Sequence, residues 1–110
     1  MSTGARLGDR HCQPLPKGTA ALGVAEISAL LAEVGGWSHA GGAIRKTYSF
    51  ANYGETVAFV NAVAWIAQRE DHHPDITFGY NRCEVAFNTH SIGGISMNDF
   101  ICAAKIEALL

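Results

Sequence analysis

The chain has 110 residues, of which 48% are hydrophobic and 16% are charged, and its net charge is −2 when the histidines are neutral. This length and composition predict one folded domain with a single core and exclude a disordered chain. The charge provides no basic surface for nucleic acid, and no apolar run approaches the roughly 20 residues that a membrane span needs. The low charged fraction favours self-association.

The cysteines and the N-terminal segment predict a cytoplasmic protein. Three cysteines, an odd number without a C-x-x-C pair, are expected to be free thiols in a reducing compartment. Residues 1–22 carry Gly, Pro and polar residues without periodicity and without the apolar stretch of a secretory signal. We expect them to form a flexible arm ahead of a single domain over residues 23–110.

The first regular elements are a helix and a hairpin. Gly35-Gly36 ends the helix, and Gly41-Gly42 turns the chain from an extended stretch at Trp37 into a strand over residues 43–50. On this strand Lys46 falls among apolar side chains, where its stem can lie along the core while the ammonium group reaches the rim. Helical spacing places five apolar side chains on one face of the helix: Val24, Ile27, Leu30, Leu31 and Val34.

The strongest helix signal covers residues 52–71. Asn52 and Glu55 fit an N-cap residue followed by an acid three places on. Pro74 is expected to end the element, because a residue before proline avoids helical angles. His72 and His73 therefore lie at a helix C-terminus. The apolar stripe is broad enough to cover a sheet and comprises Tyr53, Val57, Val60, Ala64 and Ala67, widened by Phe59, Val63 and Ile66.

Two strands and a helix complete the chain. The first strand runs over residues 76–80, with Tyr80 expected in the core, and the second runs over residues 83–89, with its apolar side chains facing inward. Ser96, with Asp99 three residues later, predicts a capping box that opens the last helix. The order of elements predicts an α+β fold, in which a four-stranded antiparallel sheet carries three helices packed on one face.

Three of the five histidines lie between residues 70 and 90. His72 and His73 are at the helix end, where the macrodipole favours a cationic ring, and His90 is where the second strand leaves the sheet. Histidine can donate or accept a proton at physiological pH. If the three rings face one cavity, different surroundings can keep one ring protonated and another neutral, as acid–base catalysis requires.

Other interpretations of these residues are open. A metal site is the weaker idea, because adjacent histidines point in different directions and the H-E-x-x-H spacing is absent. For any single histidine, an ordinary polar residue at an element end is the default. Asp71 is a candidate to orient a ring by accepting its N–H, and surface solvation explains it equally well. Asp99 is a weaker candidate, since its capping position favours a structural role.

His72-His73-Pro74 and Thr89-His90 form a specific combination, with Tyr80 between them and Gly94-Ile95-Ser96 and Asp99 after them. This segment resembles the signature region of the pterin-4a-carbinolamine dehydratases. That family combines His-His-Pro, an aromatic residue, Thr-His, a Gly-Leu-Thr-like turn and an Asp. The resemblance covers roughly residue 22 to the end of the chain.

The resemblance implies dehydration of 4a-hydroxytetrahydrobiopterin to quinonoid dihydrobiopterin, in pterin recycling beside an aromatic amino acid hydroxylase. It implies a homodimer or homotetramer without a metal or cofactor, since the pterin is the substrate. By position, His72 and His90 are the implied acid–base pair, and His73 chiefly holds the pterin. The further residues implied to bind the substrate are Pro74, Thr89 and Ser91.

Gln68 stands where the family often has an acid, four residues before the first histidine of the pair. A glutamine can hydrogen-bond a ring or the substrate, but it adds no negative charge. This departure leaves open a related enzyme that acts on another pterin, such as in molybdopterin metabolism. A protein-binding dimerisation cofactor is a further alternative, because some relatives bind a transcription factor through a helical face.

Overall fold

The computed structural model describes residues 6–110 and contains three α-helices and four strands in the predicted order. Residues 1–5 of the predicted arm lie outside the described residues. Within residues 6–110, no helix combines the length and the apolar character that crossing a membrane requires. The elements, including two 3₁₀ turns named η1 and η2, are η1 Leu7–Asp9, α1 Val24–Leu31, β1 Ser38–Ala40, β2 Ala43–Ser49, α2 Tyr53–Glu70, β3 Asp75–Phe78, β4 Arg82–Phe87, η2 His90–Ile92 and α3 Met97–Glu107.

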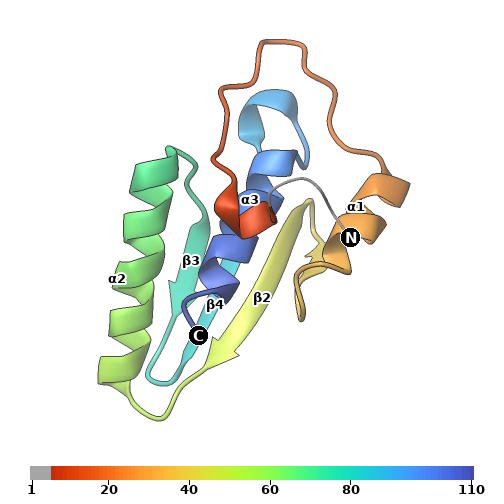
Figure 1. Ribbon diagram of the computed structural model, residues 1–110. Coiled ribbons are helices and arrows are strands. Elements are labelled where there is room, and N and C mark those ends of the chain that lie inside the picture. Colours follow the sequence, from red (N-terminus) through yellow and green to blue (C-terminus); the bar gives the residue numbers. More distant parts are fainter. Residues whose placement is uncertain (1–5) are drawn as a thin grey trace.

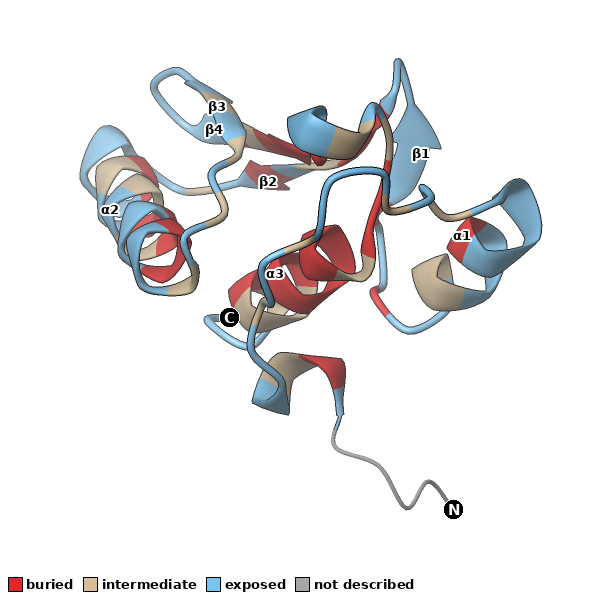
Figure 2. Ribbon diagram, turned by 90° about the horizontal axis from the view of Figure 1, so that it is seen from above, coloured by how far each residue is buried: buried red, intermediate tan, exposed pale blue. Residues whose placement is uncertain are grey.

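The four strands form one antiparallel sheet in the order β1-β2-β4-β3 (Figure 1). The central strands β2 and β4 pair with Ile44 opposite Phe87 and Tyr48 opposite Cys83. The three helices lie on one side of the sheet (Figure 2). The predicted α+β fold, with three helices packed on one face of a four-stranded antiparallel sheet, is confirmed.

Alternation along β4 gives the sheet one face that packs against the helices. Cys83, Val85 and Phe87 are buried, whereas Glu84 and Asn88 point to the other face. Burial raises the pKa of the Cys83 thiol, as expected for a cysteine that packs as a small apolar side chain. α3 is the most buried helix, and its buried apolar residues are Phe100, Ile101, Cys102, Ala103 and Ile106.

The buried face of α2 is rotated from the predicted stripe. Asn52 caps the helix as predicted, because its Oδ1 accepts a hydrogen bond of 2.9 Å from the backbone N–H of Glu55. The prediction that Tyr53 and Ala64 face the sheet is wrong, since both are exposed. Tyrosine and alanine suit the surface as well as the core, so apolar spacing alone did not fix the angle of the helix. The side chains that α2 buries are Thr56, Phe59, Val63, Ile66 and Ala67.

Tyr80 lies outside the core, contrary to the prediction. β3 ends at Phe78, so Tyr80 falls in the turn to β4, where 65% of it is exposed. There its ring stacks with that of Tyr53, at 6.4 Å between centroids.

Val24, predicted on the buried face of the first helix, is also exposed, because the short α1 buries only Ile27. Exposed apolar side chains of this kind are compatible with the expected self-association, which stays a prediction.

The described part of the predicted arm, residues 6–22, contacts the domain at several points. Leu7 is buried, and η1 packs against α3 (Figure 1). Towards the other end of the arm, the N–H of Leu22 donates to the carbonyl of Ile95 at 2.8 Å. These contacts attach the arm to the domain at specific points, which composition alone did not predict. The flexibility of the arm stays a prediction.

Lys46 lies at the rim of the core, as its position in the sequence predicts. Its Nζ donates to a carboxylate oxygen of Glu107 and to the carbonyl of Gly35, each at 2.8 Å. The Tyr48 hydroxyl and the Trp37 indole N–H donate to the same oxygen of Glu107. Burial opposes ionisation of Glu107, but these three side-chain hydrogen bonds outweigh it and lower the pKa of the carboxyl group. The charged carboxylate therefore ties the end of α3 to β2.

Glu107→Gln is expected to destabilise the fold more at neutral pH than in acid. A carboxyl group whose pKa is lower in the folded chain stabilises the fold above its unfolded pKa of about 4.3, and this contribution is lost as the pH falls through the folded pKa. Urea unfolding from about pH 7 to pH 3 measures the difference between the variant and the wild type. Glu33→Gln, at an exposed position, is the matched control. A difference that is constant across this range contradicts the prediction.

Candidate active site

The end of α2 sets the direction of His72. Asp71 adopts the left-handed conformation, with φ 52° and ψ 43°, and the N–H of His72 bonds to the carbonyl of Ala67 at 3.1 Å. This is the pattern of a Schellman motif, which satisfies the last carbonyls of a helix. The predicted place of His72, just after the helix, is correct, but Pro74 is not what ends the helix, because α2 already ends at Glu70. The reversal at Asp71 turns the chain so that His72 reaches α3.

His72 is held between a core ring and a buried carboxylate. Its ring lies almost parallel to that of Phe87, with 5.7 Å between centroids and 6° between planes. Its Nε2 lies 2.5 Å from Oδ1 of Asp99. Only 11% of the His72 side chain is exposed, and none of the Asp99 side chain is. A carboxylate at Nε2 orients the ring and fixes its tautomer, so Nδ1 is the nitrogen left to exchange a proton.

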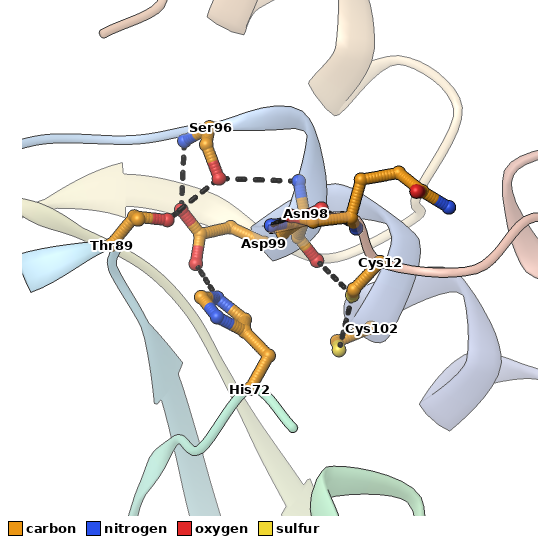
Figure 3. A network of polar contacts seen from close by, with 8 residues as sticks. Cys12, His72, Thr89, Ser96, Asn98, Asp99 and Cys102 are labelled. Atoms are coloured by element: carbon orange, nitrogen blue, oxygen red, sulfur yellow. Dashed lines mark hydrogen bonds and ion pairs between the residues drawn. The ribbon is translucent and has the colours of Figure 1, made fainter. Parts of the chain in front are cut away.

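The second oxygen of Asp99 is bound by residues of two other segments (Figure 3). Oδ2 accepts hydrogen bonds from the backbone N–H of Ser96 at 2.8 Å and from the hydroxyl of Thr89 at 2.9 Å. Because Thr89 donates to Asp99, the Ser96 hydroxyl, 2.6 Å away, donates to Thr89. The predicted capping box at Ser96 and Asp99 is confirmed. One carboxylate thus caps α3 and also contacts His72, which joins the two roles that the sequence left as alternatives.

His90 is carried by the turn that follows β4. Thr89 and Gly94 pair through a backbone hydrogen bond of 2.8 Å, which closes the segment that contains η2. Gly93 ends η2 with a φ of 67°, a conformation that glycine adopts without strain. His90 opens η2 and is exposed, next to the buried Thr89 that binds Asp99. The bonds of Thr89 therefore fix the place from which the His90 ring extends.

The three histidines meet at one cavity of about 460 Å³. This volume lies within the range of about 300–1,000 Å³ that is usual for small-molecule sites. The three residues that the sequence analysis singled out therefore line one cavity, and the acid–base roles of their rings stay predictions. The residues that line the cavity are Asp71, His72, His73, Asp75, Ala86, Asn88, Thr89, His90 and Ser91.

The other predicted site residues divide into two groups. Asp71, Thr89 and Ser91 line the cavity, whereas Gln68, exposed on α2, and the half-buried Pro74 do not. The roles predicted for all five of these residues stay predictions. Of the two acids predicted to orient a ring, Asp99 is the one whose carboxylate contacts a histidine of the cavity, His72.

Sequence reasoning did not identify Ala86, Asn88 or Phe87 as residues of the site. Asn88 lines the cavity on the outer face of the sheet, and Phe87 stacks on His72 from the inner face. The alternation along β4 already placed Phe87 inward and Asn88 outward. The sequence contained no signal that the ring beside Phe87 would be His72, because their contact joins separate elements.

The site is suited to moving protons at a small polar molecule. His72 has one nitrogen fixed by a carboxylate, as in the base–orienter pairs of many enzymes, while His73 and His90 are exposed at the same cavity. All three histidines therefore border the space that a small molecule could occupy. Among residues 6–110, no three side chains of His, Cys, Asp or Glu are grouped so as to hold a metal ion.

Comparison with known proteins relates residues 20–109 to the family described as pterin 4 alpha carbinolamine dehydratase. A relative from Nitrosospira multiformis is 55% identical over 103 residues, which are 94% of this chain and 91% of the relative. One from Hydrogenovibrio crunogenus is 51% identical over 112 residues, covering 100% of this chain and 99% of the relative. Both carry a provisional name as a pterin-4-alpha-carbinolamine dehydratase.

Solved structures show the same fold. A transcriptional coactivator/pterin dehydratase from Brucella melitensis superimposes with a TM-score of 0.77 at 31% identity, over 81% of this chain and 97% of that one. A pterin dehydratase-like protein, identified as a RuBisCO assembly factor in the alpha-carboxysome, matches with a TM-score of 0.55 at 23% identity, over 66% of this chain and 84% of that one. The second likeness concerns the fold alone.

Asp99→Asn is expected to lower the free energy of unfolding by about 2 kcal/mol, because an amide offers a single acceptor oxygen and turns an N–H towards a donor. Equilibrium unfolding in urea measures the change. Ser91→Ala, at the exposed rim of the same cavity, is the matched control and is expected to change stability by less than about 0.5 kcal/mol. An Asp99→Asn protein as stable as the wild type contradicts the role assigned to the buried carboxylate.

Proposed function

The chain belongs to the pterin-4a-carbinolamine dehydratase family, and from this membership we propose that it is a hydro-lyase acting on 4a-hydroxytetrahydrobiopterin. The products are quinonoid dihydrobiopterin and water. The observation that carries the proposal is the meeting of His72, His73 and His90 at one cavity, with His72 bonded to a buried carboxylate. A protein of this activity serves pterin recycling beside an aromatic amino acid hydroxylase.

The reaction needs two proton transfers and no change of oxidation state. The bond between ring carbon 4a and its hydroxyl oxygen breaks, the oxygen leaves as water after it receives a proton, and a ring nitrogen loses a proton. Two imidazoles on opposite sides of the reacting atoms supply both transfers, and each general acid or base at such a position typically contributes about 10²–10⁴-fold to the rate. The chemistry requires no group beyond those that histidine provides.

His72 suits the role of base. Asp99 holds its Nε2, so Nδ1 can take the proton from the ring nitrogen, and the carboxylate stabilises the imidazolium that forms. His90, on the turn after β4, then protonates the leaving hydroxyl. Both residues line the cavity, and in this proposal exchange with water restores the starting states of their rings.

The remaining cavity residues suit binding of a flat, polar bicyclic ring. His73 is exposed at the cavity and holds the pterin, while Ser91 and the backbone beside Thr89 offer polar contacts to its edges. Asn88, the residue after β4, extends the same polar surface. Polar groups of this number can orient the pterin so that its carbon 4a lies between His72 and His90.

His72→Ala and His90→Ala are each expected to lower the kcat of carbinolamine dehydration by between about 10²- and 10⁴-fold, because each removes one of the two proton-transfer groups. Stopped-flow measurement of dehydration gives the rates, and circular dichroism verifies that the variants are folded. His39→Ala removes an exposed imidazole on β1 that does not line the cavity, so it serves as the matched control.

Retention of full activity by the folded double variant His72→Ala/His90→Ala overturns the proposed mechanism. The same assay with a panel of hydroxylated pterins tests the substrate. Turnover of another pterin in preference to the biopterin carbinolamine overturns the proposed substrate while leaving the histidine chemistry in place.

A further inference from the structure

The segment His11–Gln13 of the N-terminal arm touches the end of α2. The backbone N–H of Cys12 donates to Oε1 of Glu70 at 2.7 Å, and Nδ1 of His11 lies 2.9 Å from Oε2 of the same residue. Only 7% of the Glu70 side chain is exposed. Burial opposes ionisation of Glu70, but the bond from Cys12, aided by His11 and Lys105, outweighs it and lowers the pKa of the carboxyl group. Glu70 therefore accepts these bonds as a carboxylate.

The same segment is bound at its other side to the start of α3. The backbone N–H of Gln13 donates to Oδ1 of Asn98 at 3.0 Å, and Nδ2 of Asn98 donates back to the Gln13 carbonyl at 2.8 Å. The Sγ of Cys12 lies 3.5 Å from the carbonyl of Asn98 and 3.5 Å from the Sγ of Cys102 (Figure 3). The arm thus lies between two helix termini and bonds to both.

These two termini also carry the contact between His72 and Asp99. Glu70 is two residues before His72, and Asn98 immediately precedes Asp99. We propose that residues 11–13 act as a strap, joining Glu70 to Asn98 so that His72 and Asp99 are held at bonding distance. Glu70 and Asn98 are thereby positioning residues for the reaction. This inference rests on the proposed function only for its effect on catalysis.

The strap matters because the contact that it supports spans two separate elements. His72 follows α2 and Asp99 belongs to α3, so any separation of the two helix ends lengthens their hydrogen bond. Misplacement of a reacting group by about 1 Å can cost about 10²-fold in rate, even when the cause lies away from the chemistry. The bonds to Cys12 and Gln13 involve backbone atoms of the arm, so they depend on the chain path more than on the arm's side chains.

Glu70→Ala and Asn98→Ala, made in the full chain, test the strap from its two ends. Each is expected to lower kcat by about tenfold with little change in KM, since neither residue lines the cavity. Releasing either end frees the whole strap, so the double variant is expected to lose no more activity than one single variant. Glu70→Gln keeps an oxygen for the Cys12 N–H and should restore most of the activity. Arg69→Ala, which changes the exposed neighbour of Glu70, is the matched control.

A second measurement does not depend on activity. The ¹⁵N and ¹H signals of the His72 ring report whether Nε2 stays protonated and bonded to Asp99. The strap predicts that Glu70→Ala and Asn98→Ala both shift the ring towards a mixture of tautomers, and that Arg69→Ala does not. Wild-type ring signals in both single variants overturn the inference, as do kcat losses that simply multiply in the double variant. A wild-type protein without dehydratase activity instead refutes the proposed function, while the ring signals still test the strap.

Discussion

The carboxylate of Asp99 is the interaction on which the site depends. It is fully buried, and a buried charge is tolerated only where it is paired and hydrogen-bonded. Its two oxygens meet three groups from different parts of the chain: the His72 ring after α2, the Thr89 hydroxyl after β4, and the backbone N–H of Ser96 before α3. Satisfying this one charge therefore brings together the three segments that line the cavity or support it.

The fold makes this convergence possible by ending its elements at one edge. His72 and His73 follow the end of α2, and His90 follows the end of β4, near the start of α3. The Phe87 ring that stacks on His72 comes from the packed face of the sheet. A ring held on one side by a core aromatic residue and at one nitrogen by a carboxylate has little freedom. His90 and His73 are exposed by comparison. The site thus combines one hydrogen-bonded, mostly buried imidazole with two exposed histidines, and the bonds of the arm to Glu70 and Asn98 add a tie between the helix ends.

Much of the fold and part of the site could be predicted from the sequence, for reasons that are local. Apolar alternation located the strands, and Asn52 and Ser96 marked helix starts. The combination of His72-His73-Pro74 with Thr89-His90 indicated which histidines form the candidate site. Tyr53 and Tyr80 were misplaced because tyrosine suits surface and core alike. The pairing of His72 with Asp99, and the bonds of the arm to Glu70 and Asn98, are long-range contacts. Their residues resemble ordinary caps and charged ends until folding brings them together, so local patterns could not reveal them.

The central claim is that the imidazole rings of His72, His73 and His90 all contact one bound pterin. Its most direct test is a titration of the protein, labelled with ¹⁵N in its histidine rings, with a stable dihydropterin. The account predicts that the signals of His72, His73 and His90 change together with one dissociation constant, while His39, outside the cavity, does not change. Changes confined to a single one of the three, or the absence of any change at saturating pterin, would contradict it.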